Sequence, residues 1–206
     1  DPSTFSTMGS RSETAVDGRR LRAERGRAAV IDAMFDLIIE GHLPPAVDQV
    51  ARRSGVSTAT IFRYFGSLDE LQQETVTRFV ERFKDLLVID RLGQGSTTAR
   101  VRRFVDSRIR LFSEVGPVMH LAWIRALDQP RIAAAVRDNR RRLLEATARH
   151  FAAELGATSP RQARLADAID GICSIESWVS LTRIHDRSPD EVRRAWTTAV
   201  TTLVTP

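Results

Sequence analysis

Apolar residues recur at helical spacing through most of the chain, and glycine, proline and polar residues mark where that spacing is interrupted. A broad apolar face that begins near Arg27 predicts a first helix, which ends at Gly41. The stretch Val47–Phe65 then predicts two short helices around a turn at Gly55, because glycine adopts positive φ without a steric penalty. A helix as short as the second one is not stable alone in water, so we expect neighbouring helices to hold it in place.

The segment Ser67–Glu70 has the sequence of a capping box and predicts the start of a long helix that continues to about Ile89. The sequence contains no strand-like alternation and no internal repeat, so we expect an all-α protein of about nine helices. The remaining helices are predicted at Thr97–Val115, Val118–Leu127 and Pro130–Leu155, in a segment that begins at Pro160, and from Pro189 onward, with a break at Gly116-Pro117.

The two helices predicted in Val47–Phe65 are typical of a helix-turn-helix, whose second helix enters the major groove of DNA. Ile61 and Phe65 are four residues apart and share the buried side of this helix, with Phe62 flanking it. The residues left to face outward are Thr58, Ala59, Thr60, Arg63 and Tyr64. Sequence-specific binding requires contacts that hold phosphates and contacts that read base edges. The predicted DNA-binding residues lie on this outer face and at the helix N-termini: Ser57, Thr58, Ala59, Thr60, Arg63, Tyr64 and Ser67.

These residues are expected to divide the two roles according to their side chains. Thr58 and Thr60 lie near the N-terminal end of the second helix, where hydroxyl and methyl groups meet base edges. Arg63 is expected to bind a guanine edge through two hydrogen bonds, and a phosphate contact is the alternative. Ser57 and Ser67 lie at helix N-termini, where they join backbone amides in holding phosphates.

Charge and composition permit nucleic-acid binding but do not establish it. The 206 residues carry a formal net charge of +5, and the pI is about 10.7. The arginines of Gly18–Arg27 form either an arm that reaches DNA or the solvated start of a helix, whereas those of Arg140–Arg142 are interpreted as a solvated helix face. Residues 1–20 are expected to be a disordered or tag-like tail.

The sequence favours a cytoplasmic protein without a membrane span, cofactor or metal site. No apolar run approaches the roughly 20 residues that a bilayer requires. Cys173 is the only cysteine, so an intramolecular disulfide is impossible. No motif typical of an enzyme occurs, and we expect no catalytic activity. The histidines lack metal-ligand spacing and lie at His42, His120, His150 and His185.

The motif around the turn resembles the signature of the TetR family of transcriptional repressors. The residues that carry the resemblance are Gly55-Val56-Ser57, Thr60–Phe65, Ser67 and Asp69-Glu70-Leu71. The resemblance covers roughly Arg27 to Thr75 and implies a helix-turn-helix DNA-binding domain at 21–66, followed by a helical effector-binding and dimerisation domain at 67–206. It also implies that the hydroxyl of Tyr64 contacts a phosphate.

The chain departs from the family pattern at two phosphate anchors. The family usually has a lysine after Ser67, where this chain has Leu68. It often has a threonine that caps its second helix, where this chain has Pro45-Ala46. We therefore expect weaker anchoring to the DNA backbone, which the arginines of Gly18–Arg27 offset.

The resemblance further implies a repressor that binds double-stranded operator DNA at a palindromic site as a homodimer and is released by a small apolar or amphipathic ligand. The last two helices are expected to form the dimer surface, because Gly171, Ser174 and Ser177 permit close helix approach. The final helix adds an apolar stripe that contains Trp196. The alternative is that this stripe faces the core of its own chain.

Aromatic and polar residues alternate in the helical domain, which is expected for a mostly apolar ligand site with a few polar anchors. Packing or solvent exposure is the alternative at each position. Two other functions remain open: a redox sensor acting through Cys173, which requires an exposed thiol of low pKa, and a DNA-binding or architectural protein that acts without a ligand. The predicted ligand-binding residues are Phe104, Arg108, Phe112, His120, Trp123, Asn139, Leu143, Thr147, Asp170, Cys173, Ser174, Ser177 and Trp178.

Overall fold

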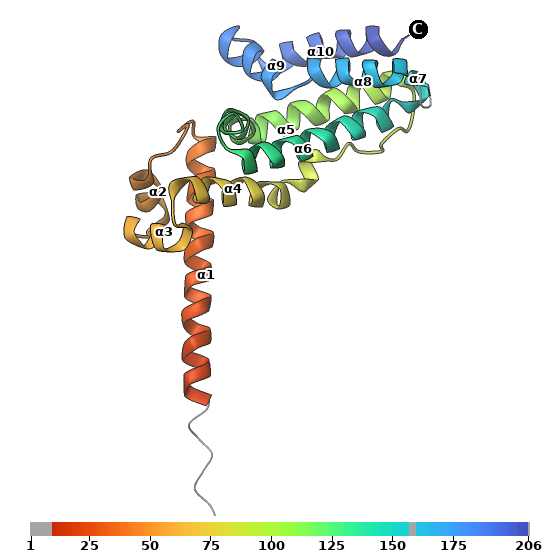
Figure 1. Cartoon of the computed structure of the whole chain (residues 1–206). Helices are drawn as coiled ribbons and strands as arrows, with labels where there is room; N and C mark the ends of the chain where they lie inside the picture. Colours follow the sequence, from red (N-terminus) through yellow and green to blue (C-terminus); the bar gives the residue numbers. More distant parts are fainter. Residues whose placement is uncertain (1–9, 157–159, 206) are drawn as a thin grey trace, which may run out of the picture. The chain divides into compact units, whose positions relative to one another are not determined.

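The computed structural model describes residues 10–156 and 160–205, and their backbone is helical between loops and turns, without strands (Figure 1). This confirms the all-α prediction. The chain divides into two compact units, which we call the N-terminal unit (Asp1–Thr75) and the C-terminal unit (Val76–Pro206). The helix α4, Leu68–Arg82, contains the boundary between them. None of the helices in the described ranges is long and apolar enough to cross a membrane.

The N-terminal unit consists of three helices, which pack on one another and are followed by the first half of α4. α1 contacts both α2 and α3, and α2 contacts α3. The predicted burial of Ile61 and Phe65 is confirmed, since only 1% and 3% of their surfaces are exposed. The helices span Ser10–Ile39 (α1), Val47–Ser54 (α2) and Thr58–Phe65 (α3). The core of this unit also contains Val30, Met34, Phe35, Val50 and Leu71.

The first helix begins earlier than predicted. α1 starts at Ser10 and not near Arg27, so helical backbone extends into the segment 1–20 that was predicted to be a tail. Residues 1–9 lie outside the described part of the chain. The added turns, residues 10–26, contain five arginines, which favour helices, and Arg20 Nε lies 3.1 Å from Glu24 Oε1 one turn later. The basic run is therefore part of a continuous helix and not an extended arm.

Four helices form the main bundle of the C-terminal unit. α5 contacts α6 and α10, and α8 contacts the same two helices, so the four close into a ring (Figure 1). Large side chains fill its interior, and Phe104, Phe112, Phe151, Ile169 and Trp196 are almost completely buried. The elements span Lys84–Leu87 (η1), Thr97–Arg125 (α5), Pro130–His150 (α6), Ala152–Leu155 (α7), Pro160–Ile172 (α8), Ile175–Val179 (α9), Ser180–Ile184 (η2) and Pro189–Val204 (α10).

The predicted break at Gly116-Pro117 is wrong, because α5 continues through both residues to Arg125. The separate helix predicted at Val118–Leu127 is therefore the last part of α5. A proline inside a helix removes one backbone donor, but it does not end the helix when tertiary packing holds the turns on either side. Here Val115 and Val118 are buried, and a Cβ at Gly116 would lie only 3.5 Å from Ile175 and Trp178.

Three helices predicted as continuous are interrupted. α4 ends at Arg82 and is followed by the 3-10 turn η1. Phe151, with φ −103° and ψ 19°, separates α6 from α7. Ser174 separates α8 from α9: its backbone is extended, and its Oγ accepts a hydrogen bond from the backbone N–H of Ser177 at 3.2 Å. Ser174 is thus a helix cap, a role that serine favours.

Candidate DNA-binding surface and effector pocket

The turn between α2 and α3 has the geometry of a helix-turn-helix. Gly55 ends α2 in the left-handed region, with φ 69° and ψ 13°. Ser57 then caps α3, since its Oγ accepts a hydrogen bond from the backbone N–H of Thr60 at 3.3 Å and donates one to Thr60 Oγ1 at 3.0 Å. The family-like sequence motif therefore produces the local structure that presents α3.

The outer face of α3 carries the side chains that were predicted to read DNA. Ala59 and Arg63 are exposed, and Thr58 and Thr60 are half-buried. Arg63 lies along this face, with its Nη2 3.4 Å from Thr60 Oγ1 and its Cζ 5.9 Å from the centroid of the Tyr64 ring. These contacts hold a long cationic side chain along the outer face of α3 without neutralising its charge.

Two other arginines of the helix-turn-helix are paired with carboxylates. Arg53 donates from both terminal nitrogens to Glu40, at 2.8 and 2.6 Å, and thereby connects α2 to the segment after α1. This pairing lowers the pKa of Glu40 and raises the pKa of Arg53. Arg52 pairs with Asp48 within α2 at 2.8 Å. Arg63 differs from both because its contact within hydrogen-bonding range is to a neutral hydroxyl.

Tyr64 packs against α1 at a glycine. A Cβ at Gly26 would lie 2.7 Å from the Tyr64 hydroxyl, so only glycine leaves room for this ring. The adjacent Arg27 donates to the backbone carbonyl of Tyr64 and to Glu74, and its Cζ lies 4.6 Å above the Phe65 ring. Arg27 therefore fastens α3 to α1 and α4. Arg27 was predicted only as part of the basic run Gly18–Arg27, because nothing near it in sequence marks these partners.

The N-terminal ends of α2 and α4, where phosphate anchors were considered from the sequence, are capped differently. Ala46 lacks a capping hydroxyl, as expected, and its backbone N–H instead donates to Gln49 Oε1 at 2.8 Å. Gln49 Nε2 is in turn 3.1 Å from His42 Nδ1. At the start of α4, Ser67 Oγ accepts from the backbone N–H of Glu70 at 3.1 Å, which confirms the predicted cap.

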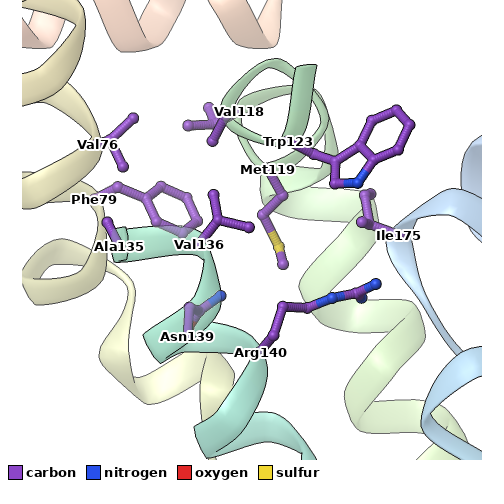
Figure 2. Close-up of a pocket in the computed structure, with 11 residues that line it drawn as sticks. Val76, Phe79, Val118, Met119, Trp123, Ala135, Val136, Asn139, Arg140 and Ile175 are labelled. Carbon is purple, nitrogen blue, oxygen red and sulfur yellow. The ribbon is translucent and has the colours of Figure 1, made fainter. Parts of the chain in front are cut away.

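The C-terminal unit contains a mostly apolar pocket that opens to solvent (Figure 2). Its walls bound about 480 Å³ of empty space, part of it open solvent, and the enclosed part is narrow in this conformation. Residues from α4, α5, α6 and α9 contribute: Val76, Phe79, Val118, Met119, Ala122, Trp123, Ala135, Val136, Asn139, Arg140 and Ile175.

Two of the predicted ligand-binding residues, Trp123 and Asn139, line this pocket. His120 lies next to it, with its ring stacked on Trp123 at a centroid distance of 6.0 Å. Arg140 was not among the predicted ligand-binding residues and lines the pocket, although its arginine run suggested a solvated helix face. The apolar wall was not predicted either, because apolar residues at helical spacing do not reveal whether they face a core or a cavity.

A second group of predicted residues forms a buried polar network centred on Arg108. Its Nη2 donates to Asp170 Oδ1 at 3.0 Å, to Thr147 Oγ1 at 3.0 Å and to the Leu143 carbonyl at 3.2 Å. Burial lowers the pKa of Arg108 and raises the pKa of Asp170, while each charge favours the ionised form of the other. Burial also raises the pKa of Cys173 to about 12, so its thiol stays protonated.

The remaining predicted ligand residues belong to core packing or to a helix cap. The Phe104 ring packs against Phe151 and His150, with centroid distances of 5.2 and 6.3 Å. Phe112 and Trp178 join Trp196 in an aromatic cluster with centroid distances of 6.1 to 6.3 Å. Ser174 and Ser177 form the start of α9. The structure thus separates the predicted set into pocket wall, polar network and core.

The apolar stripe of α10 faces its own bundle. Val192, Trp196, Val200 and Val204 are buried within the chain. The side exposed to solvent contains small residues, including Ala195, and on α8 the exposed Gly171 has open space where a Cβ would project. These four residues therefore pack in the core of their own chain, which was the alternative to a role of the stripe in the dimer surface.

Sequence comparison relates the chain to known regulators. A family model described as "Bacterial regulatory proteins, tetR family" matches residues 30–75. The HTH-type transcriptional regulator BetI of Escherichia coli strain UMN026 is 30% identical over 154 residues, which cover 71% of this chain and 79% of that protein. The similarity therefore extends well beyond the helix-turn-helix into the C-terminal unit.

Two solved structures have the same fold over most of the chain. A tetR-family transcriptional regulator from Streptomyces coelicolor has a TM-score of 0.72 at 17% identity and covers 87% of this chain and 80% of its own. A transcriptional regulator from Saccharomonospora viridis, in complex with choline, has a TM-score of 0.71 at 20% identity and covers 85% of this chain and 95% of its own. At these identities the likeness concerns the fold alone.

Proposed function

Because the chain belongs to the TetR family of bacterial regulatory proteins and is a helix-turn-helix transcriptional regulator, we propose that it is a repressor controlled by a small ligand. In this proposal a homodimer binds a palindromic operator through two copies of α3. A ligand bound in the C-terminal unit then releases the operator. The observation that carries the proposal is Arg63, a charged side chain with no carboxylate within its hydrogen-bonding contacts, on the exposed face of a capped α3.

Base recognition is assigned to the outer face of α3, from Thr58 in its first turn to Arg63 in its last turn. We propose that Arg63 binds a guanine edge, a pairing worth about 1–3 kcal/mol of discrimination against other bases. Thr58 and Thr60 contribute hydroxyl and methyl groups, and Ala59 allows the backbone to approach. The contact between Arg63 and Thr60 supports this assignment. It already restricts the rotamers of the arginine, so less side-chain conformational entropy is lost when the arginine binds DNA.

Phosphate contacts are assigned to helix N-termini and to Tyr64. Ser57 and Ser67 cap α3 and α4, so the first amides of these helices are oriented to receive a phosphate oxygen. We propose that the Tyr64 hydroxyl binds a phosphate from beside α1. With Ala46 and Leu68 at two positions where the family has phosphate anchors, more of the binding depends on these groups and on the exposed arginines of α1.

The homodimer is assigned to α8 and α10. A single recognition helix covers too few base pairs for selective binding, whereas a symmetric dimer places two of them about one turn of DNA apart, roughly 34–36 Å. The exposed, small-residue sides of α8 and α10 support this choice, since small residues allow two helices to approach closely.

Release by a ligand is assigned to the pocket through α4. Val76 and Phe79 line the pocket and belong to the same helix that begins at Leu68, directly after α3. A ligand that fits the pocket better in one position of α4 shifts the population toward that position, by no more than its difference in affinity for the two. The choline complex of the Saccharomonospora viridis protein supports ligand binding in this fold.

The two alternative functions have less support. A regulator without a ligand needs no ligand site, whereas this chain has an apolar pocket, narrow in its enclosed part, that is lined by residues of four helices. A redox sensor requires a reactive thiolate, and the pKa of about 12 at the buried Cys173 keeps that thiol protonated.

A binding-site selection on random duplex DNA tests the operator proposal. We expect the enriched sequences to be palindromes with a guanine in each half-site. Arg63→Ala should lower affinity for the selected operator by roughly tenfold or more and relax the preference at one guanine position, measured by fluorescence anisotropy. Arg141→Ala, the same charge change in the C-terminal unit, is the control. Enrichment of no palindrome, or an unchanged affinity and preference in Arg63→Ala, would contradict the proposal.

A further inference from the structure

We propose that the pocket selects an amphipathic carboxylate, which binds through Arg140 and Asn139 while its hydrocarbon part lies against the apolar wall. The proposal rests on the proposed function only in treating this pocket as the effector site. It adds the chemical class of the effector and the residues that discriminate it.

Arg140 supplies the charge of the pocket. Among the eleven described residues that line it, Arg140 is the only charged one, and none is acidic. Its Nη2 donates to both Glu176 oxygens at 2.8 Å, and this pair holds the guanidinium in place. An arginine has five N–H donors, so the donors on Nη1 and Nε lie outside this ion pair. A ligand carboxylate can therefore bind Arg140 while the contact to Glu176 persists.

Asn139, which precedes Arg140 on α6, supplies a second polar group in the pocket wall. Its Oδ1 is buried and has no hydrogen-bond partner, a state that is costly unless a bound molecule or water relieves it. The oxygen and nitrogen of an asparagine amide are assigned from their surroundings and exchange by a simple flip. The amide can thus donate to a carboxylate oxygen as readily as it accepts from a carboxylic acid or an amide.

The lining residues divide by polarity along the pocket. Figure 2 shows Asn139 and Arg140 together at one end, with Val76, Phe79 and Val118 at the other. Met119 lies between the two ends, and its flexible, polarisable side chain adapts to the shape of an apolar group. A molecule with one anionic end and an apolar body matches this order. A ligand that is polar along its whole length would leave polar groups unpaired against the apolar wall.

The same lining disfavours a cationic ligand. Choline, which is bound by the Saccharomonospora viridis regulator, is a quaternary ammonium ion and is stabilised by aromatic faces and carboxylates. Phe79 and Trp123 offer aromatic faces here, but none of the described wall residues is acidic, and the nearby Glu176 carboxylate is already paired with Arg140. The pocket therefore lacks an unpaired carboxylate that would stabilise a quaternary ammonium ion, and we expect this chain to bind carboxylates and not choline.

Isothermal titration calorimetry with the full chain tests the proposal without DNA. The probes are octanoate and 4-phenylbutyrate as carboxylates, octanamide as a neutral analogue, and choline. We expect at least one carboxylate to bind about tenfold or more tightly than octanamide, since a charge-assisted hydrogen bond is lost in the amide. Choline should give no heat of binding at the same concentrations. Binding of choline without the carboxylates, or of no probe, would overturn the assignment.

The adjacent arginines provide a matched pair of variants. Arg140→Met should weaken carboxylate binding by about tenfold or more and leave octanamide unchanged. Arg141→Met, at an exposed residue that pairs with Asp138, should alter neither. If Arg140→Met fails to fold by circular dichroism, Arg140→Gln combined with Glu176→Gln removes both charges and should give the same loss. Equal carboxylate affinity in wild type and these variants would refute the role of Arg140.

The result of the calorimetry does not depend on the result of the operator selection. Carboxylate binding is measured on protein without DNA, so its outcome is the same whether or not a palindrome is selected. Conversely, suppose that Arg63→Ala lowers operator affinity as expected but no carboxylate binds. The DNA-binding proposal would then stand, and only the ligand class would be wrong. Release of the selected operator by octanoate or 4-phenylbutyrate, measured in the wild-type chain, would connect the two.

Discussion

At the scale of single residues, His150 is a histidine that burial and its two backbone hydrogen bonds fit to the neutral form. It is completely buried, its Nδ1 accepts a hydrogen bond from the Gly93 N–H at 3.1 Å, and its Nε2 lies 3.0 Å from the Arg100 carbonyl. An accepting Nδ1 and a donating Nε2 describe the neutral imidazole. Burial is the main cause that lowers the pKa of His150 below its usual value of 6.5, although the Arg100 carbonyl opposes this shift.

This lowered pKa predicts an acid-sensitive fold. Below about pH 6.5 the unfolded state binds a proton at His150 that the folded state resists. The free energy of unfolding should therefore fall as the pH drops from about 6.5 toward the lowered pKa, by at most about 1.4 kcal/mol per pH unit for this group. Above that range this group should make stability independent of pH. Urea unfolding at pH 7.5, 6.5 and 5.5 measures the effect.

The matching variants are His150→Gln and His185→Gln. His150→Gln loses stability at every pH because it disturbs two buried hydrogen bonds, but its stability should vary less with pH than that of wild type. His185 is exposed, so His185→Gln should retain the wild-type pH dependence. An identical slope in His150→Gln and wild type would assign the acid sensitivity to other groups.

Neighbouring arginines show why some site residues were predictable and others were not. Arg63 lies in a motif whose spacing relates it to a buried face, so its exposure followed from the sequence. Arg140 and Arg141 are adjacent in sequence, yet one lines the pocket and the other is exposed. Their difference depends on Glu176, thirty-six positions away, and such partners leave no local signal.

At the scale of elements, two helical glycines of α1 have opposite surroundings. A Cβ at Gly18 would have nothing within 4 Å, whereas one at Gly26 would collide with the Tyr64 ring. Alanine stabilises a helix by about 0.8–1.0 kcal/mol relative to glycine when its Cβ does not clash with a neighbouring side chain. The helix therefore tolerates alanine at one site, while the packing of α3 requires glycine at the other.

We predict that these glycines respond differently to the same substitution. Gly18→Ala should increase helix content by circular dichroism and leave operator affinity unchanged. Gly26→Ala should displace the Tyr64 hydroxyl and weaken operator binding by roughly tenfold, the cost of about one charge-assisted hydrogen bond, measured by fluorescence anisotropy. Equal operator affinities of the two variants would argue against a DNA contact from Tyr64.

Element boundaries were predicted well where local chemistry decides them and poorly where packing decides them. The caps at Ser57 and Ser67 and the turn at Gly55 depend on side-chain oxygens and glycine backbone freedom, and they occur as predicted. Pro117 was expected to end a helix, but its turn is held by buried neighbours. Ser174 was expected inside a helix and instead starts a new one.

At the scale of the whole molecule, the exposed side of α10 is suited to a dry interface. Thr198 donates its hydroxyl proton to the Arg194 carbonyl and Thr202 donates to the Thr198 carbonyl, both at 3.0 Å. These polar groups are already satisfied within the helix, so covering them costs little. With Ala195 and Gly171 exposed nearby in the two helices proposed for the dimer, the surface offers small groups for close packing.

We predict that a large charge on this surface prevents dimer formation. Gly171→Arg and Ala195→Arg should shift the chain from dimer to monomer in size-exclusion chromatography with light scattering. They should also weaken operator binding strongly, because each half-site is then bound separately. Ala134→Arg adds the same charge at an exposed position of α6 and should remain dimeric. Dimers in all three variants would place the interface elsewhere.

The sequence by itself determined the helical class, the helix-turn-helix and the outer face of α3, because helical periodicity, caps and glycine turns act within a few residues. Only the tertiary structure decided which polar residues of the C-terminal unit meet. Arg108 joined Asp170 across the bundle, Arg140 joined Glu176 at the pocket, and Arg27 joined Glu74 beside α3. Each pair links positions more than thirty residues apart, and packing of whole helices brings them together.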